Sequence, residues 1–186
     1  MPGLDGDDPT EQLLAWAAIQ PDAPALCAPG IAAMTFGELA QRMRAIGARL
    51  AEWGIVRGDV VVWPNIDRAS SAAAQAILPF SSTLVPIAAS TTEDACAELL
   101  ARLRPKAVAL PAGTMHPIAT VARRMGIAQI SAVADAQGGV GAFDVELTRA
   151  DASLDASRPV SPDFAFVSAT SGSTGKPKLV PHGRRQ

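Results

Sequence analysis

The segment Gly58-Asp59-Val60-Val61-Val62-Trp63 decides the fold class of this chain. A Gly-Asp turn leads into a run of β-branched residues without polar alternation, which is typical of a strand buried on both faces of a parallel sheet. Downstream, short apolar runs alternate with segments whose apolar residues recur at helical spacing. The expected strands cover 83–87, 107–110 and 127–133, and the expected helices cover 68–78, 92–103 and 117–125. This alternation predicts an α/β fold with a mostly parallel sheet and helices on both of its faces.

Two further helices are expected upstream of this segment. The first follows Asp8, whose side chain can cap the first turn. The second is marked by Thr35 and Glu38, which have the three-residue spacing of a capping box. Gly54 stands where a helix commonly ends.

The regular alternation stops after residue 133. Residues 134–162 are rich in Gly, Ala, Asp and Ser, and only 143–147 has the composition of a strand, so we expect a long surface connection. The glycines of 138–141 lack the strand and helix context of a dinucleotide-binding motif. The chain therefore divides into a βαβ-type region (1–133), a connecting loop (134–162) and a strand–loop–strand region (163–180).

The charge and composition exclude several function classes. The formal net charge of the 186 residues is −2, which gives no electrostatic reason to expect nucleic acid or an anionic membrane as a partner. No apolar run reaches the ~20 residues of a membrane span, and the acidic N-terminus lacks the regions of a secretory signal, so a cytoplasmic protein is expected. Cys27 and Cys96 have neither metal-ligand nor disulfide spacing, and we assign no metal site within the chain.

The most informative segment for chemistry lies near residue 175. A short apolar run, 164–168, leads into Thr170-Ser171-Gly172-Ser173-Thr174-Gly175-Lys176-Pro177-Lys178, and Leu179-Val180 resumes a strand. Glycines allow successive backbone N–H groups to point inward and bind an anion, hydroxyls add donors, and lysines add positive charge. The residues expected to contact phosphate are Thr170, Ser171, Gly172, Ser173, Thr174, Gly175, Lys176 and Lys178.

This loop differs from the common P-loop. Only two residues separate Gly172 from Gly175, and a proline follows Lys176 instead of a helix start. By composition alone, a flexible Ser/Gly turn is the favoured alternative to a phosphate site.

The order of residues nevertheless resembles the AMP-binding signature of the adenylate-forming superfamily, which includes acyl-CoA synthetases, the adenylation domains of nonribosomal peptide synthetases, and luciferases. The match covers Thr170 to Gly175, Pro177 and Lys178, while Leu179 replaces the usual final glycine. Other segments resemble earlier motifs of the family, in the correct order: 34–39, 54–61, 64–65 and 76–87. The resemblance therefore extends over nearly the whole chain and implies the N-terminal part of the large domain of that fold.

The resemblance also implies a reaction. Family members let a carboxylate attack the α-phosphorus of Mg·ATP, which gives an acyl-adenylate and pyrophosphate. A thiol of CoA or of a carrier-protein pantetheine then accepts the acyl group. Residues 170–178 would hold the β- and γ-phosphates, with ATP and Mg²⁺ as cofactors and a small carboxylic acid as substrate. The favoured expectation is an acid–thiol ligase like the acyl-CoA synthetases of fatty acid metabolism, and the alternative is an amino-acid or aryl-acid adenylation domain of a peptide synthetase.

In the family, the adenine-stacking segment, the glutamate associated with Mg²⁺, the ribose-binding aspartate and a mobile C-terminal domain with its catalytic lysine all follow this loop. Since the sequence ends at Gln186, we expect the main catalytic residues to lie beyond it and this chain alone not to adenylate a substrate. The remainder of the enzyme is then its expected partner. A non-catalytic binding module and a truncated gene product are the alternatives, and the coding DNA after Gln186 would distinguish them.

The last residues allow two interpretations each. If His182 matches a family histidine, it could neighbour the acyl site, and the alternative is an exposed terminal histidine. Arg184 and Arg185 could contact phosphate, although a basic tail is the favoured interpretation.

Overall fold

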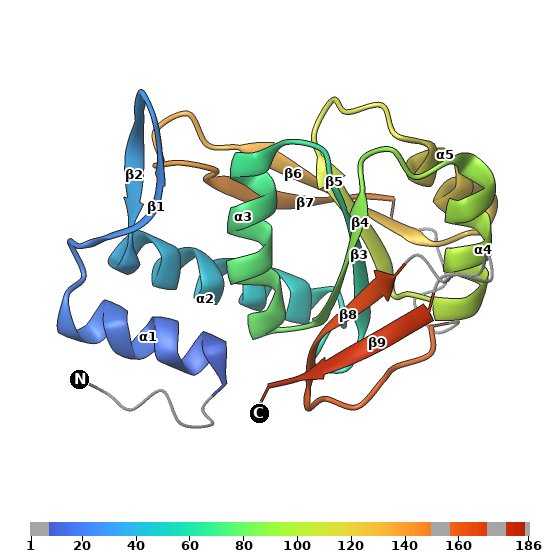
Figure 1. Ribbon diagram of the computed structural model, residues 1–186, viewed down its shortest axis with the longest axis horizontal. Coiled ribbons are helices and arrows are strands. Elements are labelled where there is room, and N and C mark those ends of the chain that lie inside the picture. Colours follow the sequence, from blue (N-terminus) through green and yellow to red (C-terminus); the bar gives the residue numbers. More distant parts are fainter. Residues whose placement is uncertain (1–7, 150–156, 171–177, 185–186) are drawn as a thin grey trace.

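The computed structural model describes residues 8–149, 157–170 and 178–184. The helices are α1 (Pro9–Ile19), α2 (Phe36–Glu52), α3 (Arg68–Ile77), α4 (Glu93–Leu103) and α5 (Pro117–Arg124), with the 3-10 helix η1 (Leu78–Phe80). The strands are β1 (Pro24–Ala28), β2 (Ile31–Thr35), β3 (Val60–Asn65), β4 (Thr83–Ala88), β5 (Ala107–Pro111), β6 (Ala128–Ala134), β7 (Phe143–Arg149), β8 (Phe164–Thr170) and β9 (Lys178–Gly183). Within these residues, one sheet dominates and has the strand order β7-β6-β5-β3-β4-β8-β9 (Figure 1).

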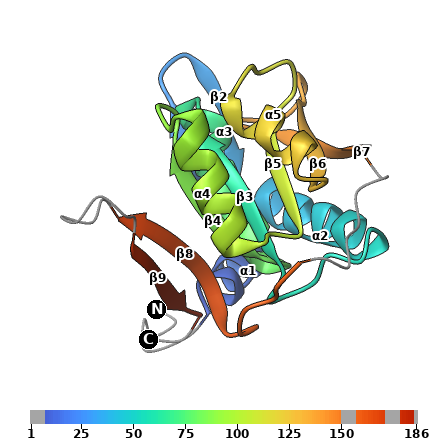
Figure 2. The same cartoon turned by 90° about the vertical axis from the view of Figure 1, so that its right-hand side faces the viewer.

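The central strands of this sheet are parallel. β6, β5, β3, β4 and β8 pair in parallel, whereas β7 and β9 close the two sides as antiparallel neighbours of β6 and β8. Figure 2 shows β8 and β9 at one side of the molecule and β6 and β7 at the other. The prediction of a mostly parallel α/β sheet is therefore confirmed.

Helices cover both faces of the sheet, and the central strand explains why. Successive side chains of a strand point to opposite faces. Val61 and Trp63 accordingly belong to one buried cluster with α2 and α3, while Val60 and Val62 belong to a second cluster with α4 and α5. Figure 1 shows the two helix pairs on opposite sides of β3 and β4. This two-sided burial confirms the expectation drawn from the unbroken β-branched run.

The helix ends follow the local sequence. Asp8 caps α1 by accepting a hydrogen bond from the Thr10 backbone N–H. Thr35 and Glu38 form both hydrogen bonds of a capping box at the start of α2. Gly54 follows α2 with a φ of +70°, a conformation that glycine adopts without steric cost. No helix in the described part of the chain is long and apolar enough to cross a membrane.

The connection after β6 contains the expected strand, which is β7. Before β7, this segment packs against the small antiparallel sheet of β1 and β2, since the Val140 N–H donates to the Ala32 carbonyl. Val140 and Ala142 are buried there. The segment therefore contributes to the core as well as joining two strands.

Candidate functional site

The predicted phosphate loop lies between two paired strands. β8 and β9 are antiparallel, and their register pairs Thr170 with Lys178 at one end and Phe164 with Gly183 at the other. The two strands stand at one side of the sheet. Residues 171–177, which the sequence places between the paired Thr170 and Lys178, lie outside the described residues.

The direction of β8 places this end of the hairpin at the edge of the sheet where α/β proteins bind ligands. β8 runs parallel to β4, with Leu84 opposite Phe166. Its last residue, Thr170, therefore lies at the same edge of the sheet as Asn65 and Ala88, the last residues of β3 and β4. Ligands of open parallel sheets bind outside the carboxyl ends of the strands.

Only part of the predicted residue set can be placed. Thr170 ends β8 and Lys178 begins β9, where Lys178 is exposed. The next residue, Leu179, packs against the cluster under α4 and α5, together with Val167. This inward leucine orients the start of β9 and leaves the neighbouring lysine on the solvent side. The other predicted residues, Ser171, Gly172, Ser173, Thr174, Gly175 and Lys176, lie outside the described residues.

His182 stands in β9, near the end of the hairpin away from Lys178. It pairs with Phe166 across the strands and is exposed. The structure therefore does not bring His182 and Lys178 together.

A second histidine lies at the carboxyl edge of the sheet. His116 caps α5 by accepting the Ile118 N–H on Nδ1 at 3.2 Å, and its Nε2 lies 3.2 Å from the carbonyl oxygen of Ala89. Burial lowers the pKa of His116, and the hydrogen bonds to the Ala89 and Ala88 backbone oppose this shift only partly. The arrangement fits a neutral ring that joins the segment after β4 to the start of α5.

Polar groups also gather after β3. A hollow at this edge is lined in part by Asn65, Asp67, Ser71 and Gln75. The Gln75 amide donates to Asn65 Oδ1 at 3.5 Å. Within the described residues, His, Cys, Asp and Glu form no group of three or more that could hold a metal ion.

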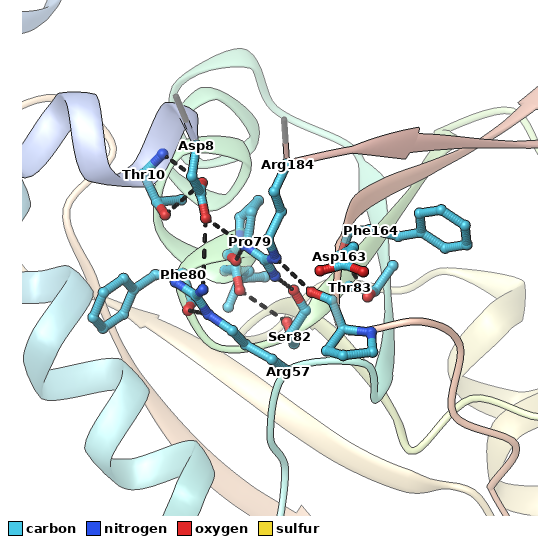
Figure 3. A network of polar contacts seen from close by, with 12 residues as sticks. Asp8, Thr10, Arg57, Pro79, Phe80, Ser82, Thr83, Asp163, Phe164 and Arg184 are labelled. Carbon is cyan, nitrogen blue, oxygen red and sulfur yellow. Dashed lines mark hydrogen bonds and ion pairs between the residues drawn. The ribbon is translucent and has the colours of Figure 1, made fainter. Parts of the chain in front are cut away.

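Arg184 is neither the exposed basic tail nor the phosphate contact that the sequence suggested, because its side chain is buried. Its side chain is 5% exposed, and its guanidinium donates to the carbonyl oxygens of Pro162, Pro79 and Ser82 (Figure 3). The carboxylate of Asp8 lies 3.5 Å away. Charge patterning gave no signal for this role, because the carbonyl partners from Pro79 and Ser82 lie more than 100 residues earlier in the chain.

Comparisons with solved structures agree with this fold. CmiS6 matches 99% of this chain with a TM-score of 0.67 and 22% identity, over 42% of its own length. The peptide synthetase FmoA3, bound to α-methyl-L-serine-AMP, matches 98% with a TM-score of 0.60 and 27% identity, over 19% of its length. The fatty acyl CoA synthetase of Mycobacterium tuberculosis matches 95% with a TM-score of 0.64 and 18% identity, over 34% of its length. The chain thus spans less than half the length of each of these proteins.

A search of curated protein sequences found no match. The profile of the AMP-binding enzymes, in contrast, matches residues 13–186, which include every described strand and the predicted phosphate loop. This match over nearly the whole sequence shows that the chain belongs to the AMP-binding enzyme family.

Proposed function

We propose that this chain supplies the ATP phosphate-binding part of an AMP-forming ligase that activates a carboxylic acid as an acyl-adenylate. One observation carries the proposal: the Ser/Thr/Gly segment 171–177 follows Thr170 at the carboxyl end of β8 and precedes its partner Lys178 in β9. Family membership supports the same reaction class. The 134–162 segment would then connect the βαβ-type region to the phosphate-binding hairpin.

The chemistry assigned to these residues is positioning and charge stabilisation. A carboxylate oxygen of the substrate attacks the α-phosphorus of ATP, the bond from that phosphorus to the bridging oxygen breaks, and pyrophosphate leaves with the electron pair. Lys176 and Lys178 would balance the negative charge on the β- and γ-phosphates, and the hydroxyl and backbone N–H groups of 170–175 would hold them in line. Mg²⁺, bound with the ATP, would share that charge.

The second half-reaction belongs to the whole enzyme. We propose that the acyl group passes to a thiol of CoA or of a carrier-protein pantetheine, which makes the enzyme an acid–thiol ligase, as in fatty acid activation. A cytoplasmic location fits these substrates.

A second candidate is an adenylation domain of a nonribosomal peptide synthetase. The identity with FmoA3, 27%, is higher than the 18% found with the fatty acyl CoA synthetase. The two candidates differ in substrate, since the first activates a fatty or other acyl acid and the second an amino acid or an aryl acid. A panel containing both classes of acid therefore distinguishes them.

ATP–pyrophosphate exchange across such a panel tests the proposed reaction. We expect no exchange from residues 1–186 alone, and acid-dependent exchange from a longer chain in which the remaining family segments follow them. Lys178→Ala should reduce the exchange by about tenfold or more, as expected when a charged group on a transferring phosphate is lost. Arg124→Ala is the matched control, because Arg124 is an exposed cation of α5 that pairs with Glu93 at 2.8 Å and belongs to neither strand of the hairpin. Exchange by residues 1–186 would disprove their expected inactivity, and a longer chain without any exchange would contradict the proposed reaction.

A further inference from the structure

The β8–β9 hairpin has little backbone pairing to hold it on the sheet. β9 is the last strand in the order of the main sheet and pairs there with β8. β3 and β4 pair over their whole lengths, from Val60 opposite Thr83 to Asn65 opposite Ala88. Between β4 and β8, the paired position in the described residues is Leu84 with Phe166, supplemented by the Thr83 hydroxyl, which donates to the Phe164 carbonyl at 2.9 Å. Side-chain contacts therefore help to fix the angle of the hairpin, among them the packing of Val167 and Leu179 in the cluster under α4 and α5.

Arg184 supplies such contacts at the open end of the hairpin. It directly follows β9, and its backbone N–H donates to the Asp163 carbonyl beside the start of β8 at 2.6 Å. Its Nε donates to the Pro162 carbonyl at 2.8 Å, while Nη1 and Nη2 donate to the carbonyls of Pro79 and Ser82, the latter at 2.9 Å. One planar group thus joins the open end of the hairpin to η1 and to Ser82, the residue directly before β4 (Figure 3).

A buried carboxylate compensates the charge of this group. Asp8 is 3% exposed, and its Oδ2 lies 3.5 Å from Nη1 of Arg184 and 3.6 Å from Nη1 of Arg57. Oδ2 accepts no hydrogen bond within the described residues. The attraction of the two guanidinium groups therefore compensates the cost of burying this negative charge. Arg57 shares the carboxylate, but its own hydrogen bond goes to the Phe80 carbonyl, and 40% of its side chain is exposed.

We propose that Arg184 is a positioning residue that sets the angle of the β8–β9 hairpin, and thereby the place of Thr170 and Lys178 at the carboxyl edge of the sheet. Arg184 holds one end of β9 and Lys178 lies at the other, so a rotation of the hairpin about Arg184 displaces Lys178. The six residues of β9 span about 20 Å, so a tilt of about 5° at Arg184 moves Lys178 by about 2 Å. Catalysis by positioning requires the phosphate-binding residues to be placed to within much less than this distance. If the proposed function holds, the contacts of Arg184 therefore affect catalysis.

Two measurements on the 186-residue chain test this role. The first follows amide hydrogen exchange of β8 and β9 relative to β3 and β5 in the same sample. The second follows the distance between spin labels on Val180 and Met115, two exposed positions introduced as cysteines in a Cys27→Ser background. Arg184→Lys keeps the charge but removes the planar fork. Arg57→Lys is the matched control, since it makes the same change on the other cation beside Asp8.

Arg184→Lys should accelerate exchange in β8 and β9 by about tenfold or more and broaden or shift the label distance, while β3 and β5 stay protected. Arg57→Lys should change neither readout by more than about twofold. If Arg184→Lys fails to fold, Asp8→Asn is used in its place, and the same local loss is expected. Wild-type behaviour of the variant, or equal effects in the Arg57 control, would overturn the proposal. Mg·ATP binding by the wild type is measured separately, so that failure of the phosphate site and failure of the anchor give different results.

Discussion

His116 illustrates how a single residue can link two segments through its protonation state. Its Nδ1 accepts the Ile118 N–H, which leaves the proton on Nε2, facing the Ala89 carbonyl. Protonation of Nδ1 would replace this acceptor with a donor and break the cap of α5. Burial lowers the pKa of His116 in the folded chain, and the hydrogen bonds to the Ala89 and Ala88 backbone oppose this shift only partly.

The lowered pKa of His116 predicts a loss of stability in acid. The unfolded chain binds the proton near the ordinary histidine pKa of 6.5, whereas the folded chain binds it only at lower pH. The neutral ring therefore contributes its full stabilisation above pH 6.5. This contribution is lost as the pH falls toward the pKa of His116 in the folded chain. His116→Asn keeps a capping acceptor but cannot titrate. Below pH 6.5, the free energy of urea unfolding should therefore decrease less in this variant than in the wild type. An unchanged pH dependence in the variant would contradict the assigned role.

The two cysteines should differ in reactivity. Burial, together with the nearby charge of Glu93, raises the pKa of Cys96 to about 11, while Cys27 is exposed. Because the thiolate is the reactive form, iodoacetamide at about pH 8 should alkylate Cys27 and leave Cys96 intact in the folded chain. Mass spectrometry after brief labelling, with and without urea, measures this difference. Rapid labelling of Cys96 without denaturant would show that α4 opens easily.

At the scale of elements, the sequence predicted those whose formation depends on local pattern. The β-branched run of β3 and the capping box of α2 depend on neighbouring residues, and both appear where expected. β2 was not predicted. Its residues, Ile31–Thr35, lack clear alternation, and Thr35 gave a helix-start signal instead. This strand depends on pairing with β1 and on packing against the connection around Gly139, which no local pattern reveals.

The contact between β2 and the β6–β7 connection predicts an unusual sensitivity at Gly139. A Cβ atom there would lie 2.5 Å from the Met34 backbone N and Cα, both parts of β2. Gly139→Ala should therefore destabilise the chain by about 1–3 kcal/mol or more in urea unfolding, as overpacking does.

Gly113→Ala serves as the control for this substitution. Gly113 has a φ of +74°, and a Cβ added to it would meet no atom of the described residues within 4 Å. Backbone strain alone should then cost about 1 kcal/mol. If both variants lost the same free energy of unfolding, the Met34 backbone would have to move away from the added Cβ without an energetic cost.

For the whole molecule, the order of motifs along the chain predicted more than their composition did. Ser, Thr and Gly alone favoured a flexible turn, whereas the succession from Thr170 to Lys178, after the earlier segments, indicated the family that the profile match shows. The two-sided α/β sheet was predictable from the alternation of short apolar runs with segments of helical spacing. The role of Arg184 was not, because its partners come from Asp8, the η1–β4 connection and the start of β8, and only the folded chain brings them together.

The ion pair between Asp8 and Arg184 also predicts a global effect. Asp8→Ala leaves two guanidinium groups without their shared carboxylate and removes the cap of α1. Breaking a buried pair in this way costs about 3–5 kcal/mol. Thermal unfolding should therefore show a clear loss for Asp8→Ala and a smaller one for Thr10→Ala, which removes only a local partner of Asp8. Similar losses in the two variants would contradict a dominant contribution of the ion pair, because Thr10→Ala keeps both the ion pair and the backbone cap.

The most direct test of the central claim is calorimetric titration of the 186-residue chain with Mg·ATP. If the β8–β9 hairpin carries a phosphate site, the wild type and Arg124→Ala should bind with similar affinity. Lys178→Ala should bind about tenfold more weakly, because an exposed cation at the start of β9 is lost. Binding that is absent in the wild type, or equally strong in Lys178→Ala, would contradict the assignment of the phosphate site to this hairpin.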